Sequence, residues 1–371
     1  MKADFAIVGA GMAGASLAAE LAGEAELLLI EAEPQPGYHA TGRSAAFWSE
    51  SYGGPLVQPL TSASGAFLRD PPEGFAETPL LSPRGAIHLA DAAGGEALDR
   101  LAQAFAGSEV PLERLDRRAL KARIGALKPG WDEGLWEPSC ADIDVAALHG
   151  AYLRQARRRG ALLITDARLS AAERTDSGWR LGTSAGAFEA AVIVDAAGAW
   201  ADEVARACGV PPLGIRAYRR TIAQVRVAPP PPPELPLVID ALGRFYFKPE
   251  VGGRLWLSPH DETPCDPCDC APEEIDIARA VDRLEHVVDW TVERVERSWA
   301  GLRSFAPDRL PVYGFDPGAP GFFWFAGQGG FGIQTAPAAA KLAAGLLLGR
   351  APDPLVAGID PGHYSPVRLR N

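Results

Sequence analysis

Hydrophobic residues along the chain gather in short continuous runs, and amphipathic segments follow several of them. Apolar runs of about four to eight residues between turn signals are typical of buried strands in a parallel sheet. Such runs occupy residues 4–8, 26–30, 191–195 and 321–326. Leu17, Ala18 and Leu21 share one face of a helix after the first run, and an Ala/Leu-rich helix extends to Leu348 after the last. The alternation predicts an α/β fold.

Other parts of the chain are richer in β-forming residues. Four segments of this kind lie at residues 85–90, 220–227, 244–248 and 254–258. A helix is predicted after Pro272, and another after Asp144, which suits a helix N-cap. The proline run at 229–233 predicts a stiff extended connection, because proline cannot donate to a sheet ladder. We therefore expect a second, α+β unit with a large, mostly antiparallel sheet.

The first apolar run ends in a glycine turn, Gly9-Ala10-Gly11-Met12-Ala13-Gly14, which opens the first predicted helix. Gly9 suits the tight turn, Gly11 lets the backbone approach a pyrophosphate, and Gly14 lets helix and strand pack together. The helix N-terminus offers free N–H groups and a partial positive charge to phosphates. The next strand ends at Glu31, whose carboxylate suits the hydroxyls of a ribose. This order predicts a Rossmann-like dinucleotide-binding unit for NAD or FAD, since the acid disfavours NADP.

The segment that follows favours FAD over NAD. Residues 37–46, Gly-Tyr-His-Ala-Thr-Gly-Arg-Ser-Ala-Ala, make a long polar excursion where an NAD-binding chain usually enters another helix. Such a loop suits a larger cofactor. Two further segments have the same character, a strand with a small-residue turn at 191–202 and a strand that leads into a glycine loop at 321–335.

These segments resemble the D-amino-acid oxidase-like (DAO) family of FAD-dependent oxidoreductases, and the similarity spans essentially the whole chain. Within the family, the chain is similar to bacterial D-arginine dehydrogenases. The runs that carry this similarity are residues 37–46, 80–84, 299–305 and 328–330. The resemblance implies oxidative deamination of a D-amino acid to the imino acid, and then to the 2-oxo acid and ammonia, by hydride transfer to flavin N5.

The sequence shows no sign of a covalent link to the flavin, so non-covalent FAD is expected. No cysteine lies in the segments assigned to the flavin, although His39 is close to them. The expected cofactor-binding residues belong to the glycine turn, the strand tip, the 37–46 loop, the second turn and the carboxyl-terminal glycine loop. They are Gly9, Gly11, Met12, Ala13, Gly14, Glu31, Ala32, Thr41, Gly42, Arg43, Ser44, Ala45, Ala46, Ala197, Gly198, Trp200, Arg303, Gly329, Gly330, Phe331, Gly332, Ile333 and Gln334.

An amino-acid substrate needs a partner for its carboxylate, and the planar fork of arginine bonds both carboxylate oxygens. The resemblance assigns this catalytic-site role to Arg220 and Arg303, and it gives supporting hydroxyls to Tyr52 and Tyr246. The alternative interpretations are a surface arginine in an ion pair and a core tyrosine. At Arg220 the neighbouring Arg219 leaves the choice between two arginines open.

The substrate pocket is expected to be apolar. Its predicted residues are Phe47, Trp48, Ala86, His88, Gly330 and Gln334, and the backbone carbonyls of the last loop are expected near the substrate amine. In D-arginine dehydrogenase a glutamate stands in place of Ala86, where it pairs with the substrate guanidinium, and a histidine stands in place of Phe47. Because a missing carboxylate removes the preference for a cationic side chain, we expect a neutral or hydrophobic D-amino acid. Glu50 and His88 are two residues that would make the pocket polar. The alternative interpretations are a solvent-exposed Glu50 and a His88 packed in the protein interior.

Other functions fit the same residues. Oxidation of glycine, sarcosine or another secondary amine, or of a 2-hydroxy acid, would use the same carboxylate-binding set. A non-catalytic FAD subunit of a larger complex is an alternative of another class. An NAD-linked dehydrogenase is the least favoured of these functions. The expected electron acceptor is a quinone or oxygen, and no protein base is required, because the flavin takes the hydride.

The expected cofactor contacts lie at both ends and in the middle of the chain, so the domains are predicted to be discontinuous. The FAD-binding domain is assigned to residues 1–80, 140–212 and 300–371. The substrate-binding domain is assigned to residues 81–139 and 213–299.

Composition and charge narrow the partners. The formal net charge of −11 argues against nucleic acid. No stretch of about 20 apolar residues is present, so no transmembrane segment is expected. The first strand begins at once, with no signal-peptide pattern before it, and a cytoplasmic protein is expected.

The cysteines give no disulfide pattern, because their number is odd in a chain expected to be cytoplasmic. They are Cys140, Cys208, Cys265, Cys268 and Cys270. The last three lie close enough in sequence to share a soft metal. His260 is the only further ligand in sight, and a polar loop that happens to collect thiols is the alternative, so no metal is predicted.

Overall fold

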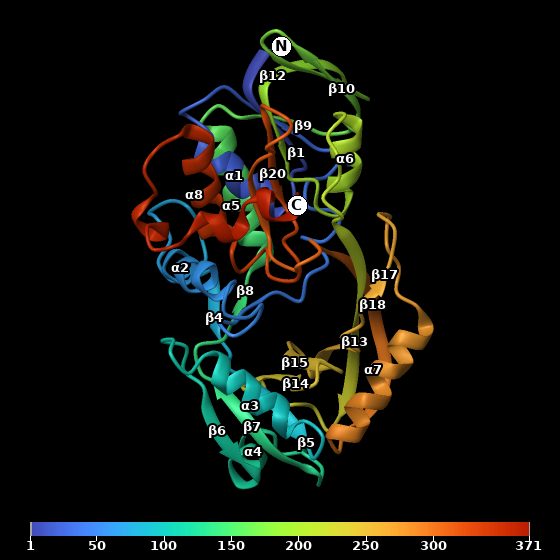
Figure 1. Cartoon of the computed structure of the whole chain (residues 1–371). Helices are drawn as coiled ribbons and strands as arrows, with labels where there is room; N and C mark the ends of the chain where they lie inside the picture. The colour runs from blue at the N-terminus through green and yellow to red at the C-terminus, as the bar shows by residue number, and fades with distance from the viewer. Residues whose placement is uncertain (1, 371) are drawn as a thin grey trace.

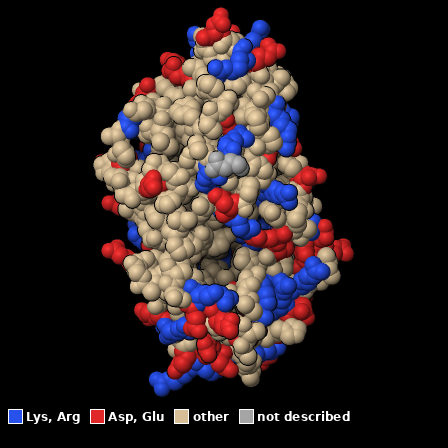
Figure 2. Space-filling view, viewed as in Figure 1, with Lys and Arg blue, Asp and Glu red and all other residues tan. Residues whose placement is uncertain are grey.

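The computed structural model describes residues 2–370 and has two parts, drawn one above the other in Figure 1. The long strands β13 (Arg216–Ala228) and β18 (Thr291–Phe305) pair along their length and run from the upper part into the lower. The surface is hollowed between the two parts, and acidic and basic side chains gather on the lower one (Figure 2).

The upper part is built on a sheet of eight strands in the order β10-β11-β12-β1-β2-β9, with β20 paired to β12 and β19 to β20. The central pairs β12–β1, β1–β2, β2–β9 and β12–β20 are parallel. The strands are β1 (Lys2–Val8), β2 (Leu27–Ile30), β9 (Leu162–Ile164), β10 (Leu169–Thr175), β11 (Gly178–Thr183), β12 (Gly186–Asp195), β19 (Val312–Phe315) and β20 (Phe322–Ala326). The four predicted apolar runs are therefore confirmed as strands of a parallel core, and the predicted α/β fold class is confirmed.

Alternate residues of β1 face different hydrophobic cores. Phe5 and Ile7 pack with the helices on one face, whereas Ala6 and Val8 pack with residues of α6 on the other. The helices of this part are α1 (Met12–Leu21), α2 (Gln58–Arg69), α5 (Val145–Arg158), α6 (Ala201–Ala207) and α8 (Ala336–Leu348). Asp144 is the predicted N-cap of α5, and its side chain accepts a hydrogen bond of 2.9 Å from Ala147 N.

The lower part is built on a nine-stranded sheet in the order β17-β13-β16-β15-β14-β5-β7-β6, with β18 paired to β13. All its pairs are antiparallel except β14–β5, as predicted for the α+β unit. The further strands are β5 (Ala86–Asp91), β6 (Glu113–Asp116), β7 (Trp131–Glu137), β14 (Leu237–Asp240), β15 (Tyr246–Glu250), β16 (Arg254–Ser258) and β17 (Thr263–Pro264). The helices α3 (Gly95–Ala104), α4 (Arg117–Arg123) and α7 (Glu274–Val287) accompany it.

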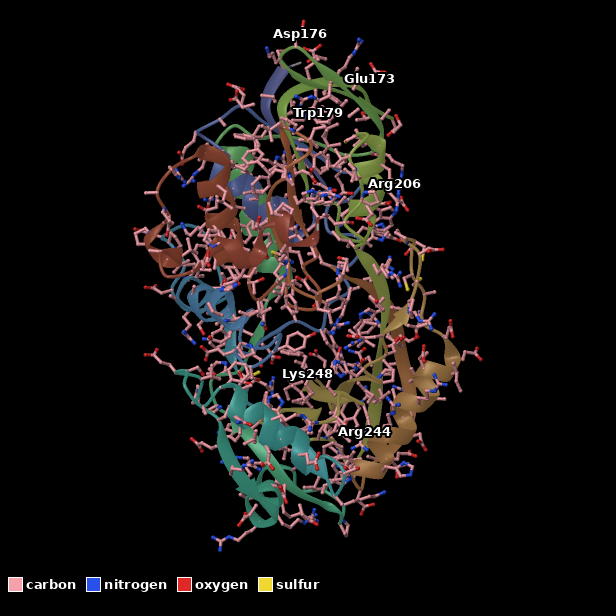
Figure 3. All side chains as sticks on the ribbon, in the orientation of Figure 1. Glu173, Asp176, Trp179, Arg206, Arg244 and Lys248 are labelled. Atoms are coloured by element: carbon pink, nitrogen blue, oxygen red, sulfur yellow. The ribbon has the colours of Figure 1, made fainter. Side chains whose placement is uncertain are left out.

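A small sheet joins the two parts. It consists of β3 (Phe47–Trp48), β8 (Ala141–Ile143) and β4 (Leu81–Pro83), in the order β3-β8-β4. Lys248 of β15, labelled in Figure 3, donates to Asp142 of β8 at 2.7 Å and so links the small sheet to the large one. Short 3-10 turns lie at Gly198–Trp200, Pro354–Val356, Pro361–Tyr364 and Pro366–Leu369.

The strands of the two large sheets fall within the ranges predicted for the two domains, except that β18 continues past residue 300 to Phe305. The assignment of these ranges to two functional domains stays a prediction, and residues 1 and 371 lie outside the described residues. Over residues 2–370, no helix combines the length and hydropathy needed to cross a membrane.

Candidate active site and cofactor cavity

One long cavity connects the carboxyl ends of the parallel strands with the large sheet of the lower part. It is lined by residues that precede and begin α1, by the tip of β2 and by the loop after it. It is also lined by the turn after β12, by β13 and β18, and by the loop before α8. Segments far apart in the chain therefore meet at the crevice where ligands of open α/β sheets bind.

The glycine turn has the geometry that its spacing predicted. Gly9 has a φ of +101°, and a Cβ there would lie 2.6 Å from Ala196 O. A Cβ at Gly14 would lie 1.8 Å from Gly9 O, so this glycine lets α1 pack against the end of β1. A Cβ at Gly11 would approach only the Thr41 hydroxyl, at 3.2 Å. Larger residues at Gly9 and Gly14 would displace backbone, whereas Gly11 faces the cavity.

The first turn of α1 and the tip of β2 fit a dinucleotide. The N-cap residue of α1 is Gly11, which has no side chain to cap the helix. The Thr41 hydroxyl accepts from Met12 N, and the other N–H groups at the start of the helix are available to phosphate oxygens. The Glu31 carboxylate accepts bonds from Ala10 N at 2.8 Å and Glu33 N at 3.0 Å. These bonds fix the carboxylate at the cavity wall and leave further lone pairs for ribose hydroxyls. The residues present therefore fit FAD at this end.

The loop after β2 closes over the same cavity. Gly42 N donates to Gly37 O at 2.8 Å, and the Thr41 hydroxyl accepts from Met12 N at 2.9 Å. Arg43 lines the cavity, but its guanidinium donates to Asp269 and to the carbonyls of Cys270 and Ala300. Its charged end therefore holds another loop of the protein and is not free for a cofactor phosphate.

The other end of the cavity gathers two arginines and two tyrosines. Arg220 and Tyr246 are 3% and 2% exposed, and each has a polar atom without a hydrogen-bond partner, Nη1 of Arg220 and the hydroxyl of Tyr246. Arg303 Nη1 donates to the Tyr52 hydroxyl at 2.7 Å. Buried donors without partners are rare in folded proteins, so these atoms indicate a missing ligand.

The electrostatics of this end favour an anion. Burial, followed by the charge of nearby Arg303, lowers the pKa of Arg220 to about 10. Arg220 Nε donates to Asp261 O at 2.7 Å, and its Nη2 contacts Glu262 at 3.3 Å, so one edge of the guanidinium is fixed. A carboxylate on the remaining edge would offset the repulsion between the two arginines.

Arg219 and Arg220 point in opposite directions, as neighbours in a strand do. Arg219 donates to Glu273 and to Asp276 of α7, the latter at 2.9 Å, on the far side of β13. Arg220 lines the cavity and Arg219 does not. The choice that the sequence left open is thereby settled in favour of Arg220 as the cavity residue.

Phe47, a predicted pocket residue, packs against the two tyrosines at this end but is not among the lining residues, and neither is Tyr52. The Phe47 ring centroid lies 5.7 Å from that of Tyr52 and 6.1 Å from that of Tyr246. Ala86 is fully buried in the cluster beneath, together with Ile222 and Leu237. Ala86 therefore supports the wall without lining the cavity.

Three predicted pocket residues lie elsewhere, and the structure corrects their placement. Trp48 is fully buried against α2 and donates to Thr61 O at 2.9 Å, because its side chain points away from Phe47. His88 is buried and bonds the Ser51 hydroxyl and Glu137 at 3.1 and 3.3 Å. It is therefore packed in the interior, which was the alternative interpretation of this residue. Gln334 is buried and holds the backbone of Ser49 and Tyr52.

Among the predicted cofactor residues, most line the cavity and a few support it from behind. The lining residues are Gly9, Gly11, Met12, Ala13, Glu31, Ala32, Thr41, Arg43, Ser44, Ala45, Ala197, Gly198, Trp200, Arg303, Gly329, Gly330, Gly332 and Ile333. Gly14, Gly42, Ala46, Phe331 and Gln334 are not among the lining residues. Phe331 packs edge-on against Tyr52 and Phe305.

Sequence reasoning missed several residues at the site. Residues 167–169 line the cavity beside Glu31, and only the parallel strand before them hints at this. Glu137 is fully buried and accepts bonds from the loop that carries Tyr52. His260 lies edge-on to Tyr246, and burial with the charges of Arg220 and Arg303 lowers its pKa to about 2, so it is neutral. No sequence motif marks Glu137 or His260.

Comparison with known proteins places these features in a family. The model of the FAD dependent oxidoreductase (DAO) family matches residues 4–346. Glycine oxidase of Geobacillus kaustophilus (strain HTA426) is 27% identical over 358 residues, which cover 93% of this chain and 92% of that protein. The crystal structure of glycine oxidase from Geobacillus kaustophilus has a TM-score of 0.84 and 25% identity, over 97% of this chain and 98% of that one. Mitochondrial dimethylglycine dehydrogenase of Mus musculus is 29% identical over 255 residues, 62% of this chain and 29% of that protein.

Proposed function

The chain belongs to the DAO family of FAD-dependent oxidoreductases, and on this basis we propose that it oxidises the Cα–N bond of a small amino acid. The proposed substrates are glycine, an N-methylglycine such as sarcosine, or a D-amino acid with a short neutral side chain. When bound, FAD accepts the hydride that leaves the substrate α-carbon. The larger hydrophobic D-amino acids that the sequence pattern favoured are not part of this proposal, because glycine oxidases are among the relatives and three aromatic rings pack together at this end.

The observation that carries the proposal is the pair of buried donors without partners. Arg220 Nη1 and the Tyr246 hydroxyl both belong to residues of the cavity wall, beside Arg303 and its partner Tyr52. Two guanidinium groups and two phenols match the oxygens of one carboxylate, which accepts charge-assisted hydrogen bonds from all of them. This set suits an α-amino acid and fixes the position of its α-carbon in the cavity.

The aromatic packing at the site supports a short side chain. Of three neighbouring rings Tyr246 lines the cavity, and the Phe47 ring centroid lies 6.1 Å from that of Tyr246 and 5.7 Å from that of Tyr52. A hydrophobic pocket of fixed shape discriminates by roughly 1–3 kcal/mol for each methylene that does not fit. Substrates longer than alanine are therefore expected to lose reactivity in steps.

The charges of the cavity support a neutral side chain. Among the described residues that line it, the acids are Glu31 and Glu33 after β2 and Glu203 of α6, all in the upper part. A cationic side chain near Arg303 would meet no carboxylate to offset its desolvation. This argues against D-arginine as the substrate.

The chain's own groups are proposed to bind and orient, and not to accept a proton. Arg220, Arg303 and Tyr246 hold the carboxylate, while the loop at 329–333 borders the space for the amine. His260, the nearest imidazole to Tyr246, is neutral but lies behind that ring and is not among the lining residues. The substrate is thus expected to react with its amine already neutral, which makes the rate rise with pH.

Turnover of a matched substrate panel tests the proposal. The panel contains glycine, sarcosine, D-alanine, L-alanine, D-phenylalanine, D-arginine and glycolate, with an artificial electron acceptor in one series and oxygen in the other. We expect the first three to react and the others to react at least ~10-fold more slowly. Peroxide in the oxygen series would identify an oxidase, and activity with the artificial acceptor alone a dehydrogenase.

Phe47→Ala gives a control for the size argument. This variant removes the ring that packs against Tyr52 and Tyr246, so that Tyr246 can yield to a larger side chain, and it is expected to raise kcat/KM for D-phenylalanine by ~10-fold or more, while glycine gains nothing. Turnover of glycolate but of no amine would contradict the proposal in favour of a hydroxy acid. A yellow protein that turns over none of the panel would favour a non-catalytic FAD subunit.

A further inference from the structure

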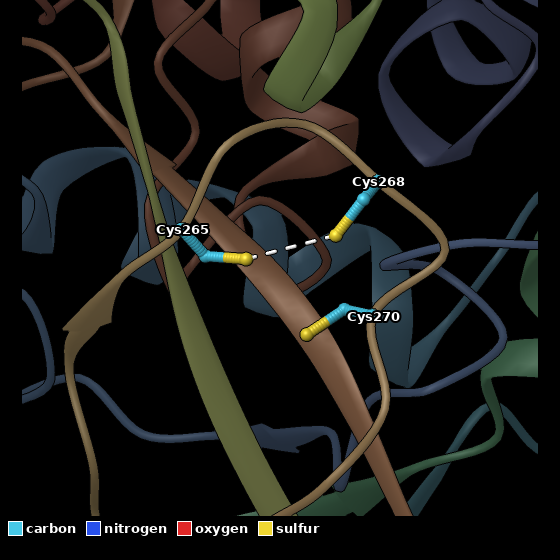
Figure 4. A group of neighbouring side chains, drawn as sticks. All are labelled: Cys265, Cys268 and Cys270. Atoms are coloured by element: carbon cyan, nitrogen blue, oxygen red, sulfur yellow. Dashed lines mark hydrogen bonds between the residues drawn. The ribbon is translucent and has the colours of Figure 1, made fainter.

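Three cysteines converge in the loop that follows β17. Cys265, Cys268 and Cys270 lie within six positions of one another, and their sulfur atoms all lie within 4.8 Å of each other. Figure 4 shows the three side chains pointing into the same space from a single turn of the loop. Cys270 is buried, Cys265 is half-buried and Cys268 is exposed.

The spacing of the sulfurs matches a shared metal ion better than a disulfide. The sulfurs of Cys265 and Cys268 are 3.6 Å apart, well beyond the ~2.05 Å of a disulfide bond. Two thiolates bound tetrahedrally to Zn²⁺ at ~2.3 Å lie ~3.8 Å apart. This pair therefore already has about the separation that a metal imposes, and the third sulfur, within 4.8 Å of both, needs only a small shift.

The neighbouring acids are engaged in other contacts. Asp269 accepts from the Tyr38 hydroxyl at 3.0 Å and also from the Arg43 guanidinium. Among the described residues, no histidine, aspartate or glutamate joins the three sulfurs, and His260 lies instead beside Tyr246. A site of three sulfurs selects soft ions such as Zn²⁺ over Mg²⁺ or Ca²⁺, with the fourth position open to water at exposed Cys268.

The same loop holds part of the cofactor cavity. Arg43 donates to Cys270 O at 2.9 Å, and the bonds of Tyr38 and Arg43 to Asp269 secure the loop from the other side. Tyr38 and Arg43 both line the FAD cavity. Cys268 and Asp269 also border a shallow groove with His39 and Trp200, two further residues of the cavity wall.

We propose that Cys265, Cys268 and Cys270 form a binding site for one thiophilic metal ion, such as Zn²⁺, which fixes this loop against Tyr38 and Arg43, two residues that line the cofactor cavity. The site is distinct from the catalytic end of the cavity and does not depend on which substrate is oxidised. Binding requires the three thiols to release their protons, so affinity rises with pH.

Metal binding by the full-length holoenzyme tests the proposal. The protein is purified under reducing conditions, stripped with a chelator, and titrated with Zn²⁺ against a chromophoric competitor and with Cd²⁺ for its thiolate charge-transfer absorbance. We expect one ion per chain. Loss of an outer-shell partner of a metal site costs 10–100-fold in affinity, so loss of a direct ligand in Cys268→Ser should cost at least ~100-fold.

The matched control is Cys208→Ala, which removes a thiol that lies in the core beside α6, away from the loop. This variant should bind Zn²⁺ as the wild type does. Because Cys268 is exposed, Cys268→Ser is not expected to unfold the protein, and its FAD absorbance verifies this. Equal Zn²⁺ affinity in wild type and Cys268→Ser overturns the proposal. So does a disulfide between Cys265 and Cys268 that persists under the reducing conditions of the purification.

Retention of FAD tests the link between the loop and the cofactor. Stripping the metal from the wild type is expected to weaken FAD binding by about 5-fold or more, the lower limit of typical coupling between sites. Zn²⁺ should restore it in the wild type and not in Cys268→Ser. Unchanged FAD affinity in a protein that binds and loses the metal overturns the proposed role of the ion in fixing Tyr38 and Arg43.

Discussion

At the scale of single residues, the site depends on one strand that sends neighbouring arginines to opposite sides. Each has one buried nitrogen without a partner, but Arg219 forms ion pairs with Glu273 and Asp276 away from the cavity, whereas Arg220 lines the cavity, where a ligand can meet its Nη1. Burying a charge this deeply is costly unless a ligand completes its hydrogen bonds. The free donor of Arg220 is therefore the strongest structural indication of an anionic substrate group.

Replacing Arg220 by lysine should weaken substrate binding selectively. Lysine keeps the charge and loses the planar fork, and hydrogen bonds to charged groups are worth about 1.5–3 kcal/mol. We expect KM for the best substrate to rise by ~10–150-fold, measured in steady-state kinetics, with FAD content unchanged. Arg219→Lys is the control and should leave KM within about twofold. An equal rise of KM in both variants would show that β13 is perturbed as a whole.

At the scale of elements, two loops converge on Tyr52. The loop before α8 brings Gly330 so close that a Cβ there would lie 2.0 Å from the Tyr52 hydroxyl and 2.9 Å from Arg303 Nη1. From the other side, Glu137 at the end of β7 accepts from Ser51 Oγ at 2.6 Å and from Glu50 N at 2.7 Å. Tyr52 lies in a turn beyond the end of β3, and the contacts of these loops set its position.

Gly330→Ala should disable substrate oxidation without unfolding the protein. The new methyl group displaces the Tyr52 hydroxyl, which breaks its bond with Arg303, while the end of the tyrosine ring can move into the cavity. We expect kcat/KM to fall at least ~10-fold, about 1.4 kcal/mol. The FAD spectrum and melting temperature should match those of Gly358→Ala, where the methyl group meets nothing within 4 Å. Full activity in Gly330→Ala would refute the assigned role of this contact.

Glu137→Gln should destabilise the fold in a pH-dependent way. Burial alone would raise the pKa of Glu137, but His88 and the hydroxyls of Ser51 and Ser49 lower it below its ordinary value. A carboxyl whose folded pKa is lowered stabilises the protein above its unfolded pKa, and this contribution is lost as the pH falls through the folded value. The Glu137→Gln substitution is expected to lower the free energy of unfolding by about 2–3 kcal/mol near neutral pH.

Urea unfolding of wild type and Glu137→Gln measures this difference. The gap in free energy of unfolding should narrow as the pH falls below the ordinary glutamate pKa of about 4.3 and through the lower pKa of folded Glu137. A gap that stays constant through this pH range would mean that the loss reflects packing and not the charge. His286, an exposed histidine on α7, offers the control variant His286→Gln, which should change stability little at either pH.

At the scale of the whole molecule, the cofactor cavity unites segments from both parts of the protein. The lining residues come from the start of the chain, from the turn after β12, from β13 and β18, and from the loop before α8. A ligand that spans these segments should stabilise all of them together, because it binds the folded state and not the unfolded one.

FAD should therefore raise the melting temperature of the apoprotein. At a free concentration about 100 times the dissociation constant, FAD is expected to add ~2.7 kcal/mol to the free energy of unfolding. Calorimetry or fluorescence-detected melting measures the shift, and NAD at the same concentration is the control. Equal stabilisation by NAD would contradict the preference for FAD that the 37–46 loop indicated.

Much of the nucleotide-binding half could be predicted from sequence, because local rules determine it. Gly9 and Gly14 are required by a turn and a close backbone contact, and Glu31 ends a strand whose apolar run is unmistakable. The Asp144 cap likewise follows from a residue type and its position. Such features need no knowledge of distant contacts.

The catalytic end was harder to predict, because distant contacts determine it. Trp48 and His88 have the chemistry of pocket residues. However, the side chain of Trp48 points into the core, where it donates to Thr61 O, and His88 is buried in contact with Glu137. His260 approaches Tyr246 from a loop that no motif marks. The convergence of three thiols is likewise a property of the folded loop and not of its spacing alone.

Anaerobic reduction of the bound flavin is the measurement that tests the central claim most directly. The purified wild type and Arg220→Lys are mixed without oxygen with glycine, sarcosine or D-arginine, and bleaching of the yellow flavin band is followed. The account predicts bleaching of the wild type by glycine or sarcosine, little by D-arginine, and a much higher half-saturating concentration in the variant. Rapid bleaching by D-arginine, or the same half-saturating concentration of glycine or sarcosine in the two proteins, would contradict it.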